Sequence, residues 1–437
     1  MTTIPDDLNP QQREAVMHRE GPCLVLAGAG SGKTRVLTQR LARLVRAGVS
    51  PGSILAITFT NKAAAEMRER LASLVPGVAF PWVQTFHAAC FRMLRQDIHW
   101  LGYANDFTII DEAEQRALFK ECLQELQEYR EKPEVACSLC KQAKNSLRPP
   151  EDFYASLPMP RGAAELHRRA YLLYHARLRE MNALDFEDLI GLCITLFREH
   201  PQVLEKYQQR FRYLMVDEYQ DTNLAQYELA RTLAGESRNL FVVGDPDQSI
   251  YSWRGAEPGN IGRFLRDFPG TRVITLETNY RSTGHILAAA NSVISRNAGR
   301  QEKTLRTDNP MGARLVRFRA ADSFQEADFV GRTVEELVRA HGYRYRDMVV
   351  FYRTHAQSRA IEDVFKRRFV PYYLVGSRGF YQRKEVRDLL AYLKLAVNPA
   401  DIINFRRVVN VPRRGVGEAT IRKIEALSQE QGIPVLE

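Results

Sequence analysis

A glycine-rich segment near the N-terminus has the residue types that bind the phosphates of a nucleotide. Its central residues are Ala29, Gly30, Ser31, Gly32, Lys33 and Thr34. Glycines let backbone N–H groups approach phosphate oxygens, Lys33 can reach the β- and γ-phosphates, and the Thr34 hydroxyl suits Mg²⁺. Ala27 stands where the usual pattern has its first glycine. The segment predicts a phosphate-binding loop of the subset that departs from the usual pattern at its first glycine. The alternative is a glycine-rich turn that binds no ligand.

The sequence around this segment predicts the elements that hold it. The apolar run Cys23–Leu26 precedes it and is typical of a buried parallel strand. Arg35–Leu41 follows with helical spacing, and we expect the helix to begin at Lys33. A strand, a glycine-rich turn and a helix N-terminus form a cradle for phosphate, because the first N–H groups of the helix lack partners within it.

Two further polar loops follow apolar runs that we predict as strands. Tyr213–Val216 is followed by Asp217 and Glu218. Leu240–Val243 is followed by a loop that contains Gln248. We interpret Asp217 as a Mg²⁺ ligand, Glu218 as a general base, and Gln248 as a hydrogen-bond partner of the γ-phosphate or the attacking water. Since parallel strands end at one edge of a sheet, the three loops together predict one site of nucleotide hydrolysis.

Composition narrows the class of protein. At 437 residues the chain is too long for one core, and about two to four domains are expected. Its net charge of +10 weakly favours a polyanionic partner. The sequence has no signal peptide and no apolar run of membrane-spanning length, which predicts a cytoplasmic protein without a membrane partner. Cys137 and Cys140 form a lone CxxC, better read as two helix residues than as metal ligands.

The order of apolar and charged segments predicts the domains. Apolar runs such as Ile54–Phe59 alternate with helical stretches, which indicates βαβ units and parallel sheets. Strands are also expected at Leu315–Phe318 and Met348–Phe351, whereas 109–183 reads as helical throughout. The expected domains are a first α/β domain at 1–108 and 184–280, its helical insertion at 109–183, a second α/β domain at 281–377, and the start of another helical insertion at 378–437.

Five residues in polar loops could contact a single-stranded nucleic acid by stacking or by charge. They are Phe59, Phe186, Tyr251, Trp253 and Arg254. An aromatic ring beside acidic residues or arginine in a loop suits base stacking, with core packing as the alternative. Tyr251 and Trp253 follow Gln248 closely, so a change of nucleotide state could reach the stacked bases.

Several segments taken in order are more specific than the phosphate-binding loop. They are Leu8–Gln12, Ile57–Ala64, Thr85–His87, Leu184–Leu189, Asp217–Asp221, Gly244–Ala256, Asn279–Ser282 and Tyr352–Thr354. With them, the chain resembles the superfamily 1 DNA helicases of the UvrD/PcrA/Rep type over essentially its whole length. The resemblance implies an α/β fold of two RecA-like P-loop domains, each with a helical insertion domain, the second pair being incomplete at the C-terminus.

The resemblance also assigns nucleotide contacts. It implies that Gln12 reads the adenine edge and that Tyr280 and Arg35 flank the adenine ring. It implies that Arg281 is an arginine finger on the γ-phosphate, which suits a planar cation with several donors. A surface salt bridge is the alternative for Arg281. The implied cofactors are ATP and Mg²⁺.

Further DNA contacts follow from the resemblance. His87 and Arg353 lie in matching segments, and His355 stands where the family usually has asparagine. The segment near the C-terminus resembles a duplex-contacting loop of the family at Gly415, Val416, Gly417 and Thr420. Backbone N–H groups at such a helix start bind phosphate, while a simple turn between helices is the alternative.

The function implied is that of an ATP-dependent DNA helicase that moves 3′→5′ on single-stranded DNA and unwinds duplexes, in DNA repair or replication restart. The expected partners are single-stranded DNA, single/double-strand junctions, repair proteins and a missing C-terminal portion of the same helicase, on the nucleoid. Downstream family motifs, including a second arginine finger, do not occur in this sequence, so the 437-residue chain alone is expected to be severely impaired. Two alternatives stay open: a subunit of a recombination helicase–nuclease, and a fragment that binds DNA and nucleotide without unwinding.

Overall fold

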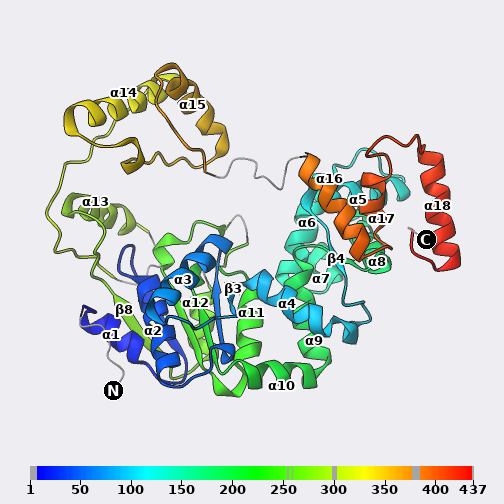
Figure 1. The fold of residues 1–437 in the computed structure, drawn as a ribbon, viewed down its shortest axis with the longest axis horizontal. Coiled ribbons are helices and arrows are strands. Elements are labelled where there is room, and N and C mark those ends of the chain that lie inside the picture. Colours follow the sequence, from blue (N-terminus) through cyan, green and yellow to red (C-terminus); the bar gives the residue numbers. More distant parts are fainter. Residues whose placement is uncertain (1–6, 253–254, 258, 298–302, 376–383, 436–437) are drawn as a thin grey trace. The chain divides into compact units, whose positions relative to one another are not determined.

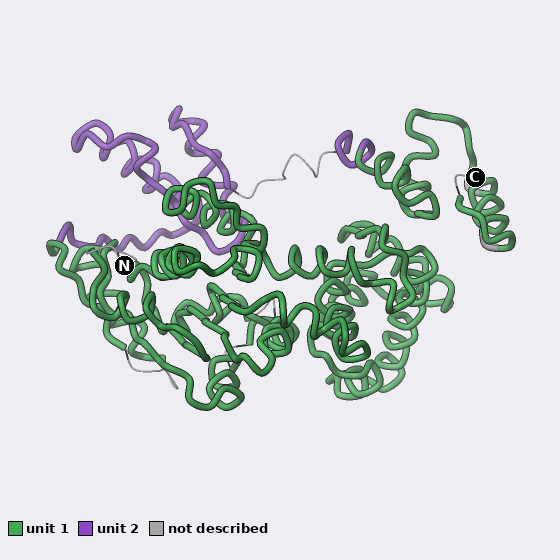
Figure 2. The backbone as a smooth tube through the Cα atoms, turned by 60° about the horizontal axis from the view of Figure 1, so that its bottom comes forward, with its two compact units in different colours: residues 1–311, 390–437 green, residues 312–389 purple. Residues whose placement is uncertain are grey.

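The structure is a computed structural model that describes residues 7–252, 255–257, 259–297, 303–375 and 384–435. The chain divides into two compact units, coloured separately in Figure 2. Unit 1 comprises residues 1–311 and 390–437, and unit 2 comprises residues 312–389. Each unit has hydrophobic clusters of its own.

A six-stranded parallel sheet lies at the centre of unit 1 (Figure 1). Its strands are, in spatial order, β3 (Val83–Thr85), β2 (Ile54–Thr58), β6 (Tyr213–Val216), β7 (Leu240–Gly244), β1 (Cys23–Ala27) and β8 (Arg272–Leu276). The strands predicted before the three polar loops are confirmed as β1, β6 and β7, and these three are neighbours. All three loops therefore leave the same edge of the sheet.

Both faces of this sheet are buried, which explains its nearly continuous apolar strands. Side chains alternate between the faces: Val25 lies in one hydrophobic cluster, while Leu24 and Leu26 lie in the other. One face is covered by α1 (Pro10–Met17), α2 (Lys33–Arg46) and α3 (Asn61–Leu74). The other is covered by α4 (Phe86–Asp97), α9 (Asp188–Glu199), α10 (Pro201–Arg210), α11 (Leu224–Ala234) and α12 (Asn260–Asp267). The predicted α/β class is confirmed.

The segment predicted as a helical insertion forms four helices joined by short loops, with a short strand at each end. Its helices are α5 (Glu112–Glu125), α6 (Pro133–Ser146), α7 (Pro150–Ala155) and α8 (Arg161–Glu180). The expectation of no strands from 109 to 183 is wrong at both ends, where β4 (Thr108–Ile109) and β5 (Ala183–Leu184) pair in parallel. Strands of two residues are too short to produce a periodic sequence pattern. Cys137 and Cys140 are buried on α6, and no metal-binding group of three side chains occurs among the described residues.

Residues beyond 390 pack against this insertion. This part of unit 1 contains α17 (Ile402–Val408), α18 (Glu418–Gln431) and the portion of α16 (Lys384–Val397) from residue 390 onward. The amide of Asn398 donates to Thr108 Oγ1 at 3.0 Å, and Lys394 Nζ donates to the carbonyl of Ile109 at 3.1 Å. Helix α13 (Gly284–Ile294) also belongs to unit 1.

In unit 2, helices α14 (Ser323–His341) and α15 (Ser358–Arg367) pack on each other through Val334 and Phe365. The predicted strands at Leu315–Phe318 and Met348–Phe351 do not form, because no described residue of unit 2 pairs with them. Val316 and Phe351 are 81% and 89% exposed. A strand needs a hydrogen-bonded neighbour, so its apolar pattern alone is not sufficient.

Short 3₁₀ turns connect several elements. They are η1 (Pro51–Ser53), η2 (Ile98–Leu101), η3 (Tyr219–Asp221), η4 (Gly235–Ser237), η5 (Pro246–Gln248), η7 (Tyr345–Asp347) and η8 (His355–Gln357). Among the helices that the structure describes, none combines the length and the hydropathy needed to cross a bilayer.

Candidate active site

The phosphate-binding loop connects β1 to α2, and α2 begins at Lys33 as predicted. Gly30 has a φ of +67°, which residues with a Cβ rarely adopt. A Cβ at this position would also lie 2.6 Å from the Nδ2 atom of Asn279. Ala27, which replaces the first glycine of the usual pattern, is the last residue of β1 and is buried in the core. The replacement therefore lies in the strand and not in the loop. Glycine is thus required where the loop meets its neighbours.

Lys33 meets the predicted general base. Its Nζ atom lies 2.8 Å from Glu218 Oε2. Glu218 has a φ of +49°, a strained conformation that is common at functional sites. Gln220 Nε2 donates to the same carboxylate oxygen at 2.8 Å. The loops after β1 and β6 therefore bring the Lys33 ammonium and the Glu218 carboxylate together.

Negative charge accumulates around this pair. Burial, and next to it the charge of Glu218, raise the pKa of Asp217 to about 7, against the attraction of Lys33. The same causes raise the pKa of Asp221 to about 6, and its Oδ1 atom is buried without a hydrogen-bond partner in the described structure. Such an excess of carboxylates fits a divalent cation. Among the described residues, no three His, Cys, Asp or Glu side chains are arranged to hold a metal ion by themselves. A cation here would therefore also need the Thr34 hydroxyl, a substrate phosphate or water as ligands.

Gln248 lies on η5 in the loop after β7. Its Nε2 atom donates to Asp245 Oδ2. The backbone N–H of Asp245 donates to Gln220 Oε1 at 2.8 Å, and Gln220 is also bound to Glu218. Hydrogen bonds therefore connect the loops after β6 and β7 continuously.

The segment Asn279–Arg281 lies against the phosphate-binding loop. Asn279 Nδ2 donates to the carbonyl of Ala29 at 2.6 Å, and the N–H of Tyr280 donates to the carbonyl of Gly30 at 3.0 Å. Asn279 Oδ1 accepts the N–H of Arg281 at 2.8 Å. Arg281 is thereby held beside the loop.

The three residues assigned to adenine surround the same loop. Gln12 is buried, and its Nε2 atom donates to the carbonyl of Ser31 at 2.8 Å. Arg35 lies in the first turn of α2. The hydroxyl of Tyr280 accepts a hydrogen bond from Asn9 Nδ2 at 2.8 Å. Gln12 thus supports the loop in this structure, and Tyr280 is about half exposed beside it.

Four of the aromatic residues considered for DNA form two stacked pairs. The ring centroids of Phe59 and Tyr251 are 5.3 Å apart, and those of His87 and Phe186 are 3.8 Å apart. Burial lowers the pKa of His87 to about 4, so its ring is neutral near neutral pH. Phe186 remains 52% exposed. Each pair joins residues from two different loops or helix starts.

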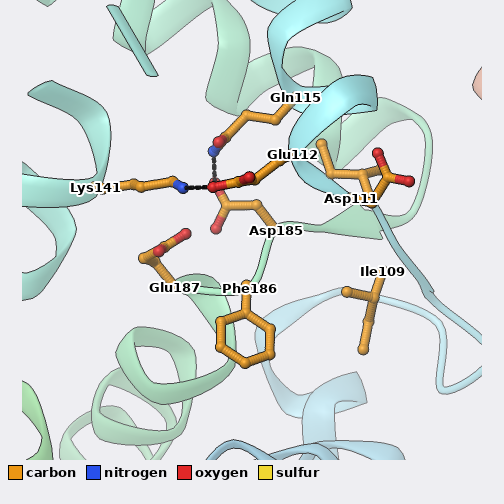
Figure 3. Close-up of a pocket in the computed structure, with 9 residues that line it drawn as sticks. Ile109, Asp111, Glu112, Gln115, Lys141, Asp185, Phe186 and Glu187 are labelled. Carbon is orange, nitrogen blue, oxygen red and sulfur yellow. Dashed lines mark hydrogen bonds and ion pairs between the residues drawn. The ribbon is translucent and has the colours of Figure 1, made fainter. Parts of the chain in front are cut away.

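A pocket of about 390 Å³ lies beside Phe186 (Figure 3). In the close-up, the Asp185 carboxylate points toward Gln115, whereas the ring of Phe186 points away from that carboxylate. Gln115 Nε2 donates to Asp185 Oδ2 at 3.1 Å. The polar wall of the pocket thus holds the segment from which Phe186 projects.

A buried ion cluster fixes the same segment. Lys144 Nζ on α6 lies 2.6 Å from Asp185 Oδ2 and 2.7 Å from Asp188 Oδ1, and all three side chains are buried. The hydroxyl of Tyr174 donates to Asp185 Oδ2 at 2.9 Å. These ion pairs connect α6 of the helical insertion to the segment Asp185–Asp188, which contains Phe186.

Replacing Lys144 by methionine should destabilise unit 1 by about 3–5 kcal/mol, because two buried carboxylates lose their ammonium. Lys141→Met on the same helix is the control, since Lys141 pairs with a largely exposed Glu112 and its loss should cost at most about 1 kcal/mol. Urea denaturation of both variants measures the difference. Equal losses would show that the buried cluster contributes no special stability.

The remaining predicted DNA residues lie elsewhere. Trp253 and Arg254 fall outside the described residues. Arg353 and His355 lie in unit 2 and are both exposed; His355 begins η8, and Arg353 lies just before its N-cap.

The predicted glycine loop near the C-terminus precedes α18. Gly415 has a φ of +72°, and Gly417 is the N-cap of the helix. Asn410 holds Val416 by two hydrogen bonds, of 2.7 and 3.1 Å. Thr420 is exposed in the first turn. The predicted loop therefore lies directly before the start of a helix.

Comparison with known families decides what these elements belong to. Residues 8–269 match the UvrD/REP helicase N-terminal domain. The chain belongs to the UvrD/REP helicase family. Residues 274–437 match the UvrD-like helicase C-terminal domain.

Named relatives of this UvrD/REP helicase chain come from bacteria. The ATP-dependent DNA helicase UvrD1 of Mycobacterium tuberculosis is 46% identical over 445 residues, which cover 98% of this chain and 57% of the relative. The ATP-dependent DNA helicase PcrA of Bacillus subtilis is 46% identical, covering 98% and 58%. PcrA of Staphylococcus aureus is 44% identical, covering 100% and 60%. The chain thus spans less than two thirds of the length of these relatives.

Sequence reasoning missed several residues that connect this UvrD/REP helicase site. They are Gln220, Asp245, Asn279 and Lys303. The first three lie inside segments that carry the family resemblance, so their polar side chains next to apolar strands could have signalled a role. Lys303 lies in no such segment, and only its burial in the structure reveals it.

Proposed function

We propose that the protein is an ATP-dependent DNA helicase that translocates 3′→5′ on single-stranded DNA and unwinds duplex DNA. The observation that carries this proposal is the hydrogen-bonded connection of Lys33, Glu218 and Gln248 at one sheet edge, beside the segment of Arg281. The names of the bacterial relatives support the same activity. Because a DNA helicase acts where the DNA lies, we place the protein in the cytoplasm, on the nucleoid. Its proposed partners are single/double-strand DNA junctions and repair proteins.

The chain's own residues would divide the chemistry of ATP hydrolysis. Lys33 and Arg281 stabilise the charge that develops on the γ-phosphoryl group, because both are cations beside the loop. Glu218 accepts a proton from the attacking water, and Gln248 orients that water. Mg²⁺ held by Thr34 and Asp217 would neutralise charge on the phosphate oxygens.

Different residues would bind the adenine and the DNA. The half-exposed Tyr280, with Arg35 and Gln12, suits the adenine. The pairs Phe59–Tyr251 and His87–Phe186 offer ring faces to bases. Further DNA contacts are proposed for Trp253, Arg254, Arg353 and His355, and for the loop from Gly415 to Gly417 with Thr420.

Phe186→Ala should weaken binding of single-stranded DNA by about 1–3 kcal/mol, the value of one stacked base. The melting temperature should change little, because the ring is half exposed. Trp100→Ala is the control, since Trp100 is exposed to a similar degree on η2. A fall in melting temperature with unchanged DNA affinity would assign Phe186 to packing instead.

The proposed activity is tested with the full-length protein in a strand-displacement assay. Duplexes with a 3′ or a 5′ single-stranded tail are supplied with ATP and Mg²⁺, and ATP hydrolysis is measured with and without DNA. The proposal expects DNA-stimulated hydrolysis and displacement from the 3′-tailed duplex. Displacement from the 5′-tailed duplex instead would contradict the proposed 3′→5′ direction. ATP hydrolysis at the same rate with and without DNA would contradict the proposed ATP-driven translocation on DNA.

A further inference from the structure

Lys303 is a buried lysine beside the loop that carries Gln248. Only 7% of its surface is exposed. Its ammonium forms an ion pair with Asp245 and lies 3.2 Å from Asp247 Oδ2. Burial of an ammonium is costly unless carboxylates compensate it. The contact therefore constrains where Lys303 and Asp245 lie.

Asp245 links Lys303 to the proposed catalytic groups. Its Oδ1 atom accepts from Lys303, and its Oδ2 atom accepts from Gln248 Nε2. Its backbone N–H donates to Gln220, which donates to Glu218. One carboxylate thus sets the orientation of the Gln248 amide, and the Lys303 ammonium restrains that carboxylate from the opposite oxygen.

The chain around Lys303 is also joined to the segment that carries Arg281. The N–H of Arg306 donates to the carbonyl of Glu277 at 2.9 Å, and the N–H of Asn279 donates to the carbonyl of Arg306 at 2.7 Å. Residues 278 and 306 form a parallel bridge. Asn279 in turn holds the backbone of Arg281. These hydrogen bonds link the chain that follows Lys303 to the segment that carries Arg281.

We propose that Lys303 is a positioning residue, which acts through Asp245 to hold Gln248 in register with the segment that carries Arg281. The proposal rests on the proposed function, because it assumes that Gln248 orients the attacking water. Lys303 touches neither substrate nor reacting atoms in this assignment. Its effect lies in the geometry of Gln248, and a small displacement of a catalytic group lowers the rate of the chemical step much more than it weakens substrate binding.

A double-mutant cycle separates this role from a merely structural one. Lys303→Met, Gln248→Ala and the double variant are made in the full-length protein. For each, kcat and KM of DNA-stimulated ATP hydrolysis, ATP affinity and melting temperature are measured. Lys206→Met is the control, because Lys206 forms an ion pair with buried Asp97, between α10 and α4.

The expected result is a fall in kcat of about 10- to 100-fold for Lys303→Met, with KM and ATP affinity nearly unchanged. The double variant should be no slower than Gln248→Ala alone, because Lys303 has no Gln248 side chain left to position in that variant. Lys206→Met should leave kcat unchanged. If Lys303→Met melts much earlier than the control, Lys303→Gln, which keeps a hydrogen-bond donor, replaces it in the same cycle.

Two results would overturn the inference. Multiplicative effects in the double variant would mean that Lys303 acts independently of Gln248, and an unchanged kcat in both Lys303 variants would mean that it positions nothing. Both require a wild-type protein that hydrolyses ATP in response to DNA. A wild-type protein without that response would instead overturn the proposed function, and this inference with it.

Discussion

Replacement of Lys33 by alanine is expected to lower DNA-stimulated ATP hydrolysis by at least about 10²–10³-fold. Lys33 is the first residue of α2, and its ammonium already lies 2.8 Å from Glu218. Its removal takes a cation from the γ-phosphate and leaves Glu218 without its counter-charge. The loss should therefore appear mainly in kcat, with a weaker affinity for ATP as a second effect.

Steady-state hydrolysis by the full-length variant and calorimetric titration with ATP measure these two effects. Lys206→Ala is the matched control, because it removes a lysine of the same domain that pairs with Asp97 on α4. Turnover close to that of the wild type in Lys33→Ala would show that the glycine-rich segment is not the phosphate site.

Glu218→Gln is expected to separate binding of ATP from its hydrolysis. The amide has the size of the carboxylate and can accept hydrogen bonds from Lys33 and Gln220, so the loops should keep their arrangement. It cannot take a proton from water, and the loss of a general base costs about 10²–10⁴-fold in rate. Single-turnover hydrolysis should be slow while ATP affinity is retained.

Glu228→Gln on α11 serves as the control for this change, since Glu228 pairs with Arg231 within its own helix. Rapid-quench measurement of bound ATP distinguishes the variants. Retained turnover in Glu218→Gln would show that Glu218 only supports the loop structure and that another residue is the base.

The elements of the phosphate site follow from local sequence. The strand β1, the glycine-rich turn and the start of α2 follow one another directly in the chain. Local sequence is therefore sufficient to predict that Gly30 lies in the turn and that Lys33 begins the helix. Asp217 and Glu218 come directly after an apolar run, and β6 ends where that run ends. Short-range steric and burial preferences are sufficient for such predictions.

The same reasoning fails where a strand needs a distant partner. The runs at Leu315–Phe318 and Met348–Phe351 have the composition of strands, yet they remain unpaired among the described residues. The strand pair Thr108–Ile109 and Ala183–Leu184 forms with almost no sequence pattern, because the hydrogen bonds of the ladder come from both ends of an insertion. Pairing is a long-range event, and composition does not report it.

The sequence by itself determined the α/β class, the three loops at the sheet edge and the family resemblance. Only the tertiary structure decided that Phe59 stacks on Tyr251, that Lys144 lies between Asp185 and Asp188, and that Lys303 holds Asp245. Lysine and aspartate are usually exposed, and nothing in their local sequence distinguishes a buried pair from a solvated one. Burial, which depends on segments far apart in the chain, turns these ordinary residues into constraints on the site.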